Sequence, residues 1–333
     1  MSFSKIVILY PNFNAYYYSF YVNTLLKNYS GIKFSRKGFP DFHQHCLAFE
    51  INHFDKNYKI YISAGDGLGF NQLGLEWCDV YAKVNVDMCK LPDKYRNKIL
   101  PIGPSFGINY LGGLQSLSQA CITFLISKLK LENSQEHFAN YYRQWKYRVP
   151  IAKYSIWNPC ENYIFHASTL WRKEETTNIY RANFMEVVNE NSSIIFEGGF
   201  APGKDDISDR FNKLTLNFKY SGIEYLSNTK RSLVVFNTSA VQGCFGWKLG
   251  EYLALGKAII STPLTNTLPS PLVHRKHIHI VNGSKKSISN AIEEIRLNHV
   301  YRQELENNSR EYFLNYLSPD SVFSRILKFA EAK

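Results

Sequence analysis

The sequence predicts an α/β protein made of two domains, each built on a parallel sheet. Apolar runs of strand length alternate with segments of helical period in both halves of the chain, and this alternation is typical of parallel sheets. The 333 residues are enough for two domains of ordinary size. Between the halves, residues 148–159 hold two prolines and show no clear period, which favours a passage between domains.

The first half begins with residues 5–10, a continuous apolar run of the kind that forms a buried parallel strand. Pro11 and Asn12 end this strand, and a helix is expected after them. No G-x-G-x-x-G pattern stands at this junction, which excludes a conventional dinucleotide-binding turn. Further strands are expected at 31–39, 46–51, 58–63, 80–84 and 99–102, and helices at 15–26, 114–130 and 134–146.

The second half repeats the alternation. Strands are expected at 163–167, 193–197, 232–236, 258–261 and 278–281, and helices at 174–189, 220–229, 247–256, 287–296 and 301–316. Ser318, Pro319 and Asp320 form a good start for a last helix that runs to about residue 330. Proline suits the first helical turn, and an acid suits the positive end of the helix dipole.

The composition indicates a globular, basic protein. The chain is 45% apolar and 20% charged, as a globular protein is, and its 39 basic and 28 acidic residues leave a net charge of +11. A basic chain can meet nucleic acid, an anionic membrane or phosphorylated substrates. Zinc-finger spacing, an RNP aromatic pair and an arginine-rich tail are all missing from the sequence, so no nucleic-acid partner is expected.

The cysteines and the N-terminus predict a cytoplasmic location. Six cysteines are scattered without a C-x-x-C pair, which indicates reduced thiols. Residues 1–12 resemble a charged strand start rather than a signal peptide, and no apolar run reaches the ~18 residues of a spanning helix. We therefore expect a soluble cytoplasmic protein, or one attached peripherally to the inner face of the membrane.

The segment 236–263 carries the strongest functional signal. A strand ends in the polar loop Asn237, Thr238 and Ser239, a glycine-containing turn follows, and a helix then opens with Lys248 and Glu251 in its first turns. Backbone N–H groups at a helix start attract anions, and Lys248 adds a positive charge there. Glu251 can accept hydrogen bonds from a vicinal diol such as a ribose. Together these features predict a nucleoside diphosphate site, although Lys and Glu three apart also form ordinary surface pairs.

The run Lys248-Leu-Gly-Glu251-Tyr-Leu-Ala-Leu-Gly256-Lys-Ala-Ile-Ile resembles the donor-binding region of GT-B glycosyltransferases over about 30 residues. The resemblance implies two Rossmann-like domains with parallel sheets facing a central cleft. It implies an acceptor domain at 1–150, a nucleotide-sugar domain at 151–317, and a helix at 318–333 that crosses back to the first domain. In that family Glu251 would hold the ribose, and neighbouring small and basic residues, among them Gly246, would hold the diphosphate.

One departure leaves the stereochemistry open. Retaining enzymes of the family-four type carry two glutamates separated by seven residues, and the first of them falls on Gly243 here. The K-L-x-E-like run at Lys248–Glu251, which follows an Asn-Ser/Thr loop, also resembles fucosyltransferases, which invert the configuration of the transferred sugar.

Other candidate donor-binding residues lie in loops expected at the carboxyl ends of the second half's strands. Arg172 and Lys173, with Arg181 on the following helix, suit a diphosphate leaving group, whose growing charge needs donors. Thr238 and Ser239 suit a phosphate, and Gly199 with Phe200 would let the backbone approach a nucleobase. The alternatives are a solvated basic loop for the first set and a simple turn for the glycines.

Asp66 is the candidate catalytic base. It stands between glycines in a loop after a strand of the first half, and an inverting enzyme needs a carboxylate to take the acceptor's proton. The alternative is an Asp-Gly turn. No Asp-x-Asp motif occurs and His43, His45 and Cys46 lack a second ligand pair, so no metal is expected.

Residues 140–148 interleave aromatic and basic side chains, as a helix lying on an anionic membrane does. The alternative is a helix that packs within its domain and turns a basic face to solvent.

These features predict a hexosyl- or deoxyhexosyl-transferase that moves a sugar from a nucleotide sugar to a glycan or lipid-linked acceptor in cell-surface polysaccharide synthesis. No cofactor is expected beside the nucleotide sugar, which is a co-substrate. The alternatives are a sugar-nucleotide epimerase of the same fold and a non-catalytic nucleotide-binding protein.

Overall fold

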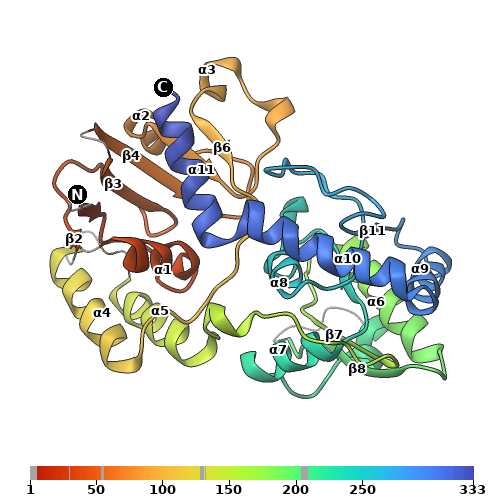
Figure 1. The fold of residues 1–333 in the computed structure, drawn as a ribbon. Helices are drawn as coiled ribbons and strands as arrows, with labels where there is room; N and C mark the ends of the chain where they lie inside the picture. The colour runs from red at the N-terminus through yellow and green to blue at the C-terminus, as the bar shows by residue number, and fades with distance from the viewer. Residues whose placement is uncertain (1–5, 30, 54–55, 128–130, 132, 204–208) are drawn as a thin grey trace. The chain divides into compact units, whose positions relative to one another are not determined.

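The computed structural model describes residues 6–29, 31–53, 56–127, 131, 133–203 and 209–333 (Figure 1). The chain forms two compact units. Unit 1 comprises Met1–Ile151, Thr267–Pro269 and Tyr316–Lys333, and unit 2 comprises Ala152–Asn266 and Ser270–Asn315.

Unit 1 is built on a six-stranded sheet with the order β2-β1-β3-β4-β5-β6. The strands are β1 (Ile6–Leu9), β2 (Gly31–Phe34), β3 (Leu47–His53), β4 (Lys56–Ser63), β5 (Val80–Lys83) and β6 (Ile99–Pro101). The expected parallel pairing holds between β1 and β2 and along β4, β5 and β6, whereas β3 runs antiparallel to both β1 and β4. Only two residues separate β3 from β4 in sequence, and a parallel pair needs a much longer crossover.

Four helices of unit 1 are ten residues or longer and pack on the sheet or on one another. These are α1 (Ser19–Asn28), α4 (Gly113–Ser127), α5 (Ser134–Tyr147) and α11 (Pro319–Glu331); α2 (Gln72–Trp77) and α3 (Asp93–Arg96) are short. Helix α4 lies beside α5, and α11 packs on α1 and β5 (Figure 1). Phe323 of α11 also stacks on Phe49 of β3, with ring centroids 5.7 Å apart. Ser318 caps α11 by accepting from Ser321 N.

Unit 2 alternates strands and helices along the chain. Its elements are β7 (Tyr163–Ser168), α6 (Glu175–Glu190), β8 (Ile195–Phe200), α7 (Gly222–Arg231), β9 (Val235–Asn237), α8 (Trp247–Leu255), β10 (Ile259–Ser261), β11 (His279–Ile280), α9 (Lys285–Leu297) and α10 (His299–Tyr312). Strands β7 and β8 are parallel, and β9, β10 and β11 form a second parallel set. Apolar side chains from β7, β9, β10, α6 and α9 form the core.

The α/β class with parallel strands in both units is thus confirmed. One local expectation was wrong. Gly198, Gly199 and Phe200 belong to β8 and pair with β7, so they are not a turn. Gly198 needs to be a glycine, because its φ is +131° and a Cβ there would lie 2.0 Å from the His166 carbonyl oxygen.

Candidate functional site

A polar cluster lies in unit 2 where β7 and β9 end. The two strands are neighbours, since Leu233 N donates to the Tyr163 carbonyl at 2.7 Å. The loops after them carry Thr169 and Thr238, and helix α8 begins shortly after the second loop. Ligands of parallel α/β sheets bind beyond the carboxyl ends of the strands, so this edge is where a site is expected.

Arg181 is the first cation of the cluster. It projects from α6 and is almost fully buried. Its Nε donates to Thr238 Oγ1 and its Nη1 donates to the Thr169 carbonyl, each at 2.9 Å, so it joins the two loops. Burial is the main cause that lowers the pKa of Arg181 to about 10, which leaves the guanidinium charged at neutral pH.

Lys248 is the second cation. It stands in the first turn of α8, and its amino group donates to the Ala167 carbonyl at the end of β7. The amino group lies 5.4 Å from the centre of the Tyr225 ring. Burial, with a further contribution from Arg181, lowers the pKa of Lys248 to about 7, while Glu251 opposes that change. The pKa of the Lys248 amine therefore lies near neutral pH.

His166 and Ser168 add polar groups without a protein partner. Both lie on β7 and are almost fully buried, and neither ring nitrogen of His166 nor the Ser168 hydroxyl has a hydrogen-bond partner among the described residues. Burial holds the pKa of His166 well below its usual range, and Lys248 and Arg181 lower it further. Buried polar groups in proteins are almost always paired, so these atoms are available to a molecule bound at the cluster.

Helix α8 has no side-chain cap at its start. Gly246 is its N-cap residue and provides no side chain to accept from the first N–H groups of the helix. Those groups and the helix dipole favour an anion at this position. The sequence therefore predicted the location of Lys248 correctly, at the positive end of a helix.

Glu251 lies one turn further along α8 and is buried. Its Oε1 accepts a hydrogen bond from the Tyr154 hydroxyl at 3.2 Å. The hydroxyls of Tyr225 and Tyr252, which are 3.5 Å apart, also lie close enough to interact with this carboxylate. A buried carboxylate among hydroxyls is suited to accept from a ligand diol.

The other residues predicted to bind the nucleotide sugar do not all lie in the cluster. Arg172 and Lys173 are exposed in the loop after β7, whereas Ser239 is half-buried and its carbonyl accepts from Thr177 Oγ1 at 3.2 Å. The Phe200 side chain packs in a small core with Met185 and Phe211, and Gly199 continues β8 beside it.

A carboxylate lies beside Gly243, the position where a glutamate is missing from the sequence pattern. Glu174, just before α6, accepts a hydrogen bond from Gln242 N at 2.7 Å. Gly243 itself has a φ of +72°, which a glutamate would adopt only with strain. Glu174 therefore reaches the residue before Gly243 from a different element, 68 positions from Gln242 in sequence.

The loop of Asp66 belongs to unit 1 and follows β4. Asp66 is exposed, and the loop around it is held by two buried side chains. Lys83 Nζ donates to the Gly67 carbonyl at 2.9 Å, and Asn85 Nδ2 donates to the Gly65 carbonyl at 3.0 Å. Burial lowers the pKa of Lys83 to about 8. This anchoring fixes the backbone on both sides of Asp66.

Sequence reasoning missed His166, Tyr154 and Glu174. His166 sits inside a predicted strand and the other two in irregular segments, and none belongs to a motif. Within the described ranges no group of three or more His, Cys, Asp or Glu side chains is arranged to hold a metal ion. In the same part of the chain no helix combines the length and apolar character needed to cross a bilayer.

Comparison by sequence finds no matching family model and no similar curated protein. Comparison of structures finds glycosyltransferases. A glycosyltransferase from Rickettsia africae is 10% identical over 81% of this chain and 70% of that one, with a TM-score of 0.47. Anabaena HepE in complex with UDP-glucose is 10% identical over 76% and 72%, with a TM-score of 0.40. The C-terminal domain of a group 1 glycosyl transferase from Francisella tularensis, LpcC, is 15% identical over 47% and 86%, with a TM-score of 0.36.

Proposed function

We propose that this chain is a GT-B glycosyltransferase that uses a nucleoside diphosphate sugar as donor. The observation that carries the proposal is the buried cluster of unit 2, in which two cations, Arg181 and Lys248, lie close together near the start of α8 and Glu251 lies one turn further along that helix. Two buried cations close together are costly unless an anion binds there. A diphosphate is an anion with the required charge and length.

Each group then has a role in transfer. Arg181, Lys248 and the N–H groups of α8 stabilise the negative charge that grows on the diphosphate as the sugar leaves. Thr238 and Ser168 bind its oxygens, and Glu251 holds the ribose diol. Asp66 takes the proton of the acceptor hydroxyl if the reaction inverts. We further propose a hexose or deoxyhexose as the sugar and a glycan or lipid-linked glycan of cell-surface polysaccharide as the acceptor, with the enzyme in the cytoplasm.

The first experiment is a thermal-shift panel of uridine, guanosine, adenosine, thymidine and cytidine diphosphates, followed by their sugar conjugates. A ligand that binds only the folded state raises the melting temperature. We expect one nucleoside diphosphate to raise it and the matching nucleoside to have little effect. If none of the five does so, the donor site is wrong. Donor turnover with labelled sugar then separates transfer to an acceptor from epimerisation and from binding alone.

Glu251→Gln is expected to weaken binding of the preferred nucleoside diphosphate by about 10- to 100-fold, because a hydrogen bond to a charged group contributes ~1.5–3 kcal/mol. Glutamine still offers an oxygen to the Tyr154 hydroxyl, so the fold should be kept. The 2′,3′-dideoxy analogue should bind wild type and variant equally in titration calorimetry. Equal losses for both ligands would refute the ribose assignment. Glu304→Gln, on the exposed face of α10, is the matched control.

The affinity for a nucleotide sugar is expected to fall as the pH rises above about 7. The free protein holds Lys248 with a pKa of about 7, and a bound diphosphate raises that pKa by favouring the charged amine. Binding then takes up a proton above pH 7 and becomes weaker. The diphosphate of a nucleotide sugar is a diester and does not itself titrate there. Lys248→Arg keeps the charge without titrating, so its affinity should be flat with pH; a sloping profile in this variant would contradict the assignment.

A further inference from the structure

Helix α4 of unit 1 is turned with its apolar face outward. Its buried residues are Ser116, Ala120, Thr123 and Ser127, a small and polar stripe. Leu114, Leu117 and Leu125 are 87%, 58% and 66% exposed, and Ile122 is exposed as well. A helix at the surface of a globular protein normally buries its apolar stripe, so this orientation is the reverse of the usual one.

Specific hydrogen bonds to α5 hold α4 in this orientation. Gln144 Nε2 donates to Ser116 Oγ at 2.6 Å, and Thr123 Oγ1 donates to the Tyr141 hydroxyl at 3.2 Å. His137 Nε2 lies 3.1 Å from the Ala120 carbonyl. Rotating α4 to bury its leucines would break these buried contacts, which is costly because each polar group would lose its partner. The leucines of α4 thus face outward because its polar stripe is hydrogen-bonded to α5.

The apolar surface of α4 continues onto α1 and β2. A groove of about 620 Å³ runs between these elements. Its apolar lining comes from Leu26, Tyr29, Ile32, Phe34, Leu114 and Ile122. Leu114 and Ile122 belong both to this lining and to the exposed apolar face of α4, so the groove and the face form one surface.

Aromatic and basic side chains border this surface. Trp145 packs over the first turn of α4, since a Cβ at Gly113 would lie 3.0 Å from its ring, and Tyr142 and Tyr147 stand exposed next to it. Lys146 is exposed on α5, and Lys27 is exposed on α1 next to the groove residue Leu26. Tryptophan and tyrosine at the edge of an apolar face, with lysines around it, are typical of helices that lie in a membrane interface.

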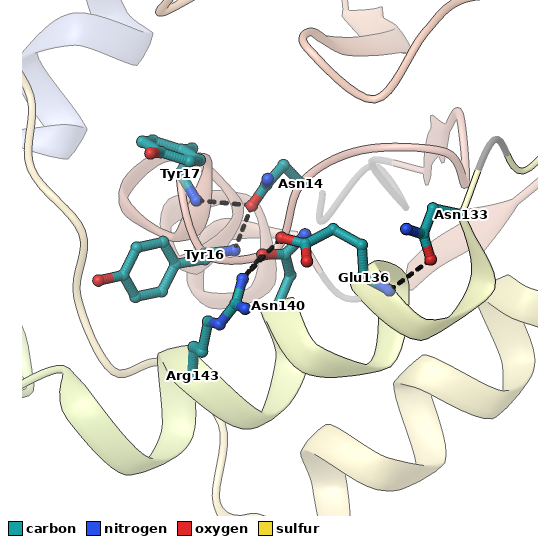
Figure 2. Close-up of polar contacts among 7 residues, drawn as sticks. All are labelled: Asn14, Tyr16, Tyr17, Asn133, Glu136, Asn140 and Arg143. Atoms are coloured by element: carbon teal, nitrogen blue, oxygen red, sulfur yellow. Dashed lines mark hydrogen bonds and ion pairs between the residues drawn. The ribbon is translucent and has the colours of Figure 1, made fainter. Parts of the chain in front are cut away.

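Other aromatic and basic residues of the segment 140–148 make contacts within unit 1. Figure 2 shows Arg143 directed back along α5 to Glu136, 2.6 Å away, and to Asn140. Tyr141 is buried, and Arg148 lies 4.0 Å from the centre of the Tyr16 ring. The apolar face of α4, rather than the basic run of α5 as a whole, is the distinctive surface.

We propose that this face docks on an anionic lipid bilayer, with Leu114, Leu117, Ile122 and Leu125 entering the interface and Trp145 at the headgroup level. The charge decides for a bilayer over a second copy of the chain. The residues of unit 1 include 20 Lys and Arg against 12 Asp and Glu, and the rim of the face carries lysines. Two such rims repel one another, whereas a negatively charged leaflet attracts them.

The test uses flotation of the full chain with vesicles of phosphatidylcholine alone or mixed with phosphatidylglycerol. We expect binding to the mixed vesicles at low salt, a decline as salt screens the lysines, and at least about a tenfold loss of vesicle affinity in the double variant Leu117→Gln and Leu125→Gln. The matched control changes two equally exposed apolar residues of unit 2, Leu297→Gln and Val300→Gln, and should bind as the wild type does.

A label reports insertion directly. Cys121 is exposed on α4 and Cys89 is the other exposed cysteine, so Cys89→Ser allows a polarity-sensitive fluorophore to be placed on Cys121. Its emission should shift to the blue on mixed vesicles. Absence of binding at low salt, equal binding by the Leu117/Leu125 variant, or a dimer that this variant converts to a monomer in sedimentation equilibrium would each overturn the proposal. Donor binding by the same variant, measured in solution, should be unchanged, so a failure here is distinct from a failure of the proposed transfer reaction.

Discussion

Arg181→Met is expected to lower the turnover of sugar transfer by about 100- to 1000-fold, the usual loss when one preorganised donor to a developing charge is removed. The buried guanidinium is already oriented by Thr238 and Thr169, so it need not reorganise as charge moves onto the diphosphate. The low polarity of its surroundings increases the strength of that interaction. Single-turnover kinetics at saturating donor measure the effect on the chemical step.

The same variant loses two hydrogen bonds between loops, so its stability needs a matched control. Arg302 is a buried arginine of unit 2 that pairs with Glu161 at 2.6 and 2.8 Å and has no contact with the cluster among its described partners. Arg302→Met should lower the melting temperature without lowering turnover per folded molecule. If both variants lose turnover alike, Arg181 acts through stability and the leaving-group assignment fails.

Asp66→Asn is expected to lower turnover by about 100-fold and to leave donor affinity within a factor of two, because a general base acts only in the chemical step. The anchors Lys83 and Asn85 donate to backbone carbonyls of the loop, and these two bonds remain possible in the variant. The measurements are steady-state turnover with saturating acceptor and calorimetric titration of the donor.

Asp93→Asn is the control for this prediction, since Asp93 is an exposed aspartate of unit 1 whose pair with Arg96 lies on a short helix. A fully active Asp66→Asn enzyme would make Asp66 a turn residue and would favour a retaining mechanism. In that case Glu174, whose carboxylate lies beside Gly243, becomes the acid to test next.

The positions of most strands and helices were predictable because they depend on local patterns. Residues 163–167 were expected as a strand and form most of β7, and the helix after Gly246 begins at Trp247 as expected. Lys248 and Glu251 are three residues apart, which places them on one face of any helix. Their relation to each other therefore required no knowledge of the tertiary fold.

The rest of the cluster is non-local. Arg181 reaches Thr238 across 57 positions and Glu174 reaches Gln242 across 68, and only the packing of α6 beside the end of β9 brings them together. His166 lies among apolar residues of a strand, so the sequence does not mark it as a site residue. Only the fold shows that it is buried close to the two cations Arg181 and Lys248. The antiparallel direction of β3 is likewise set by its pairing with β1 and β4, which is a non-local contact.

By itself, the sequence determined the alternating α/β elements and the Lys248–Glu251 helix, because hydrophobic period and helix geometry act over a few residues. Only the tertiary structure decided which side of each element is inside. The pattern of α4 specifies a helix equally well with either face buried. Its hydrogen bonds with Gln144 and Tyr141 on α5 turn its polar stripe inward and its leucines outward. Buried polar groups must be paired, and partners 18 and 28 residues away fix the choice between the two faces.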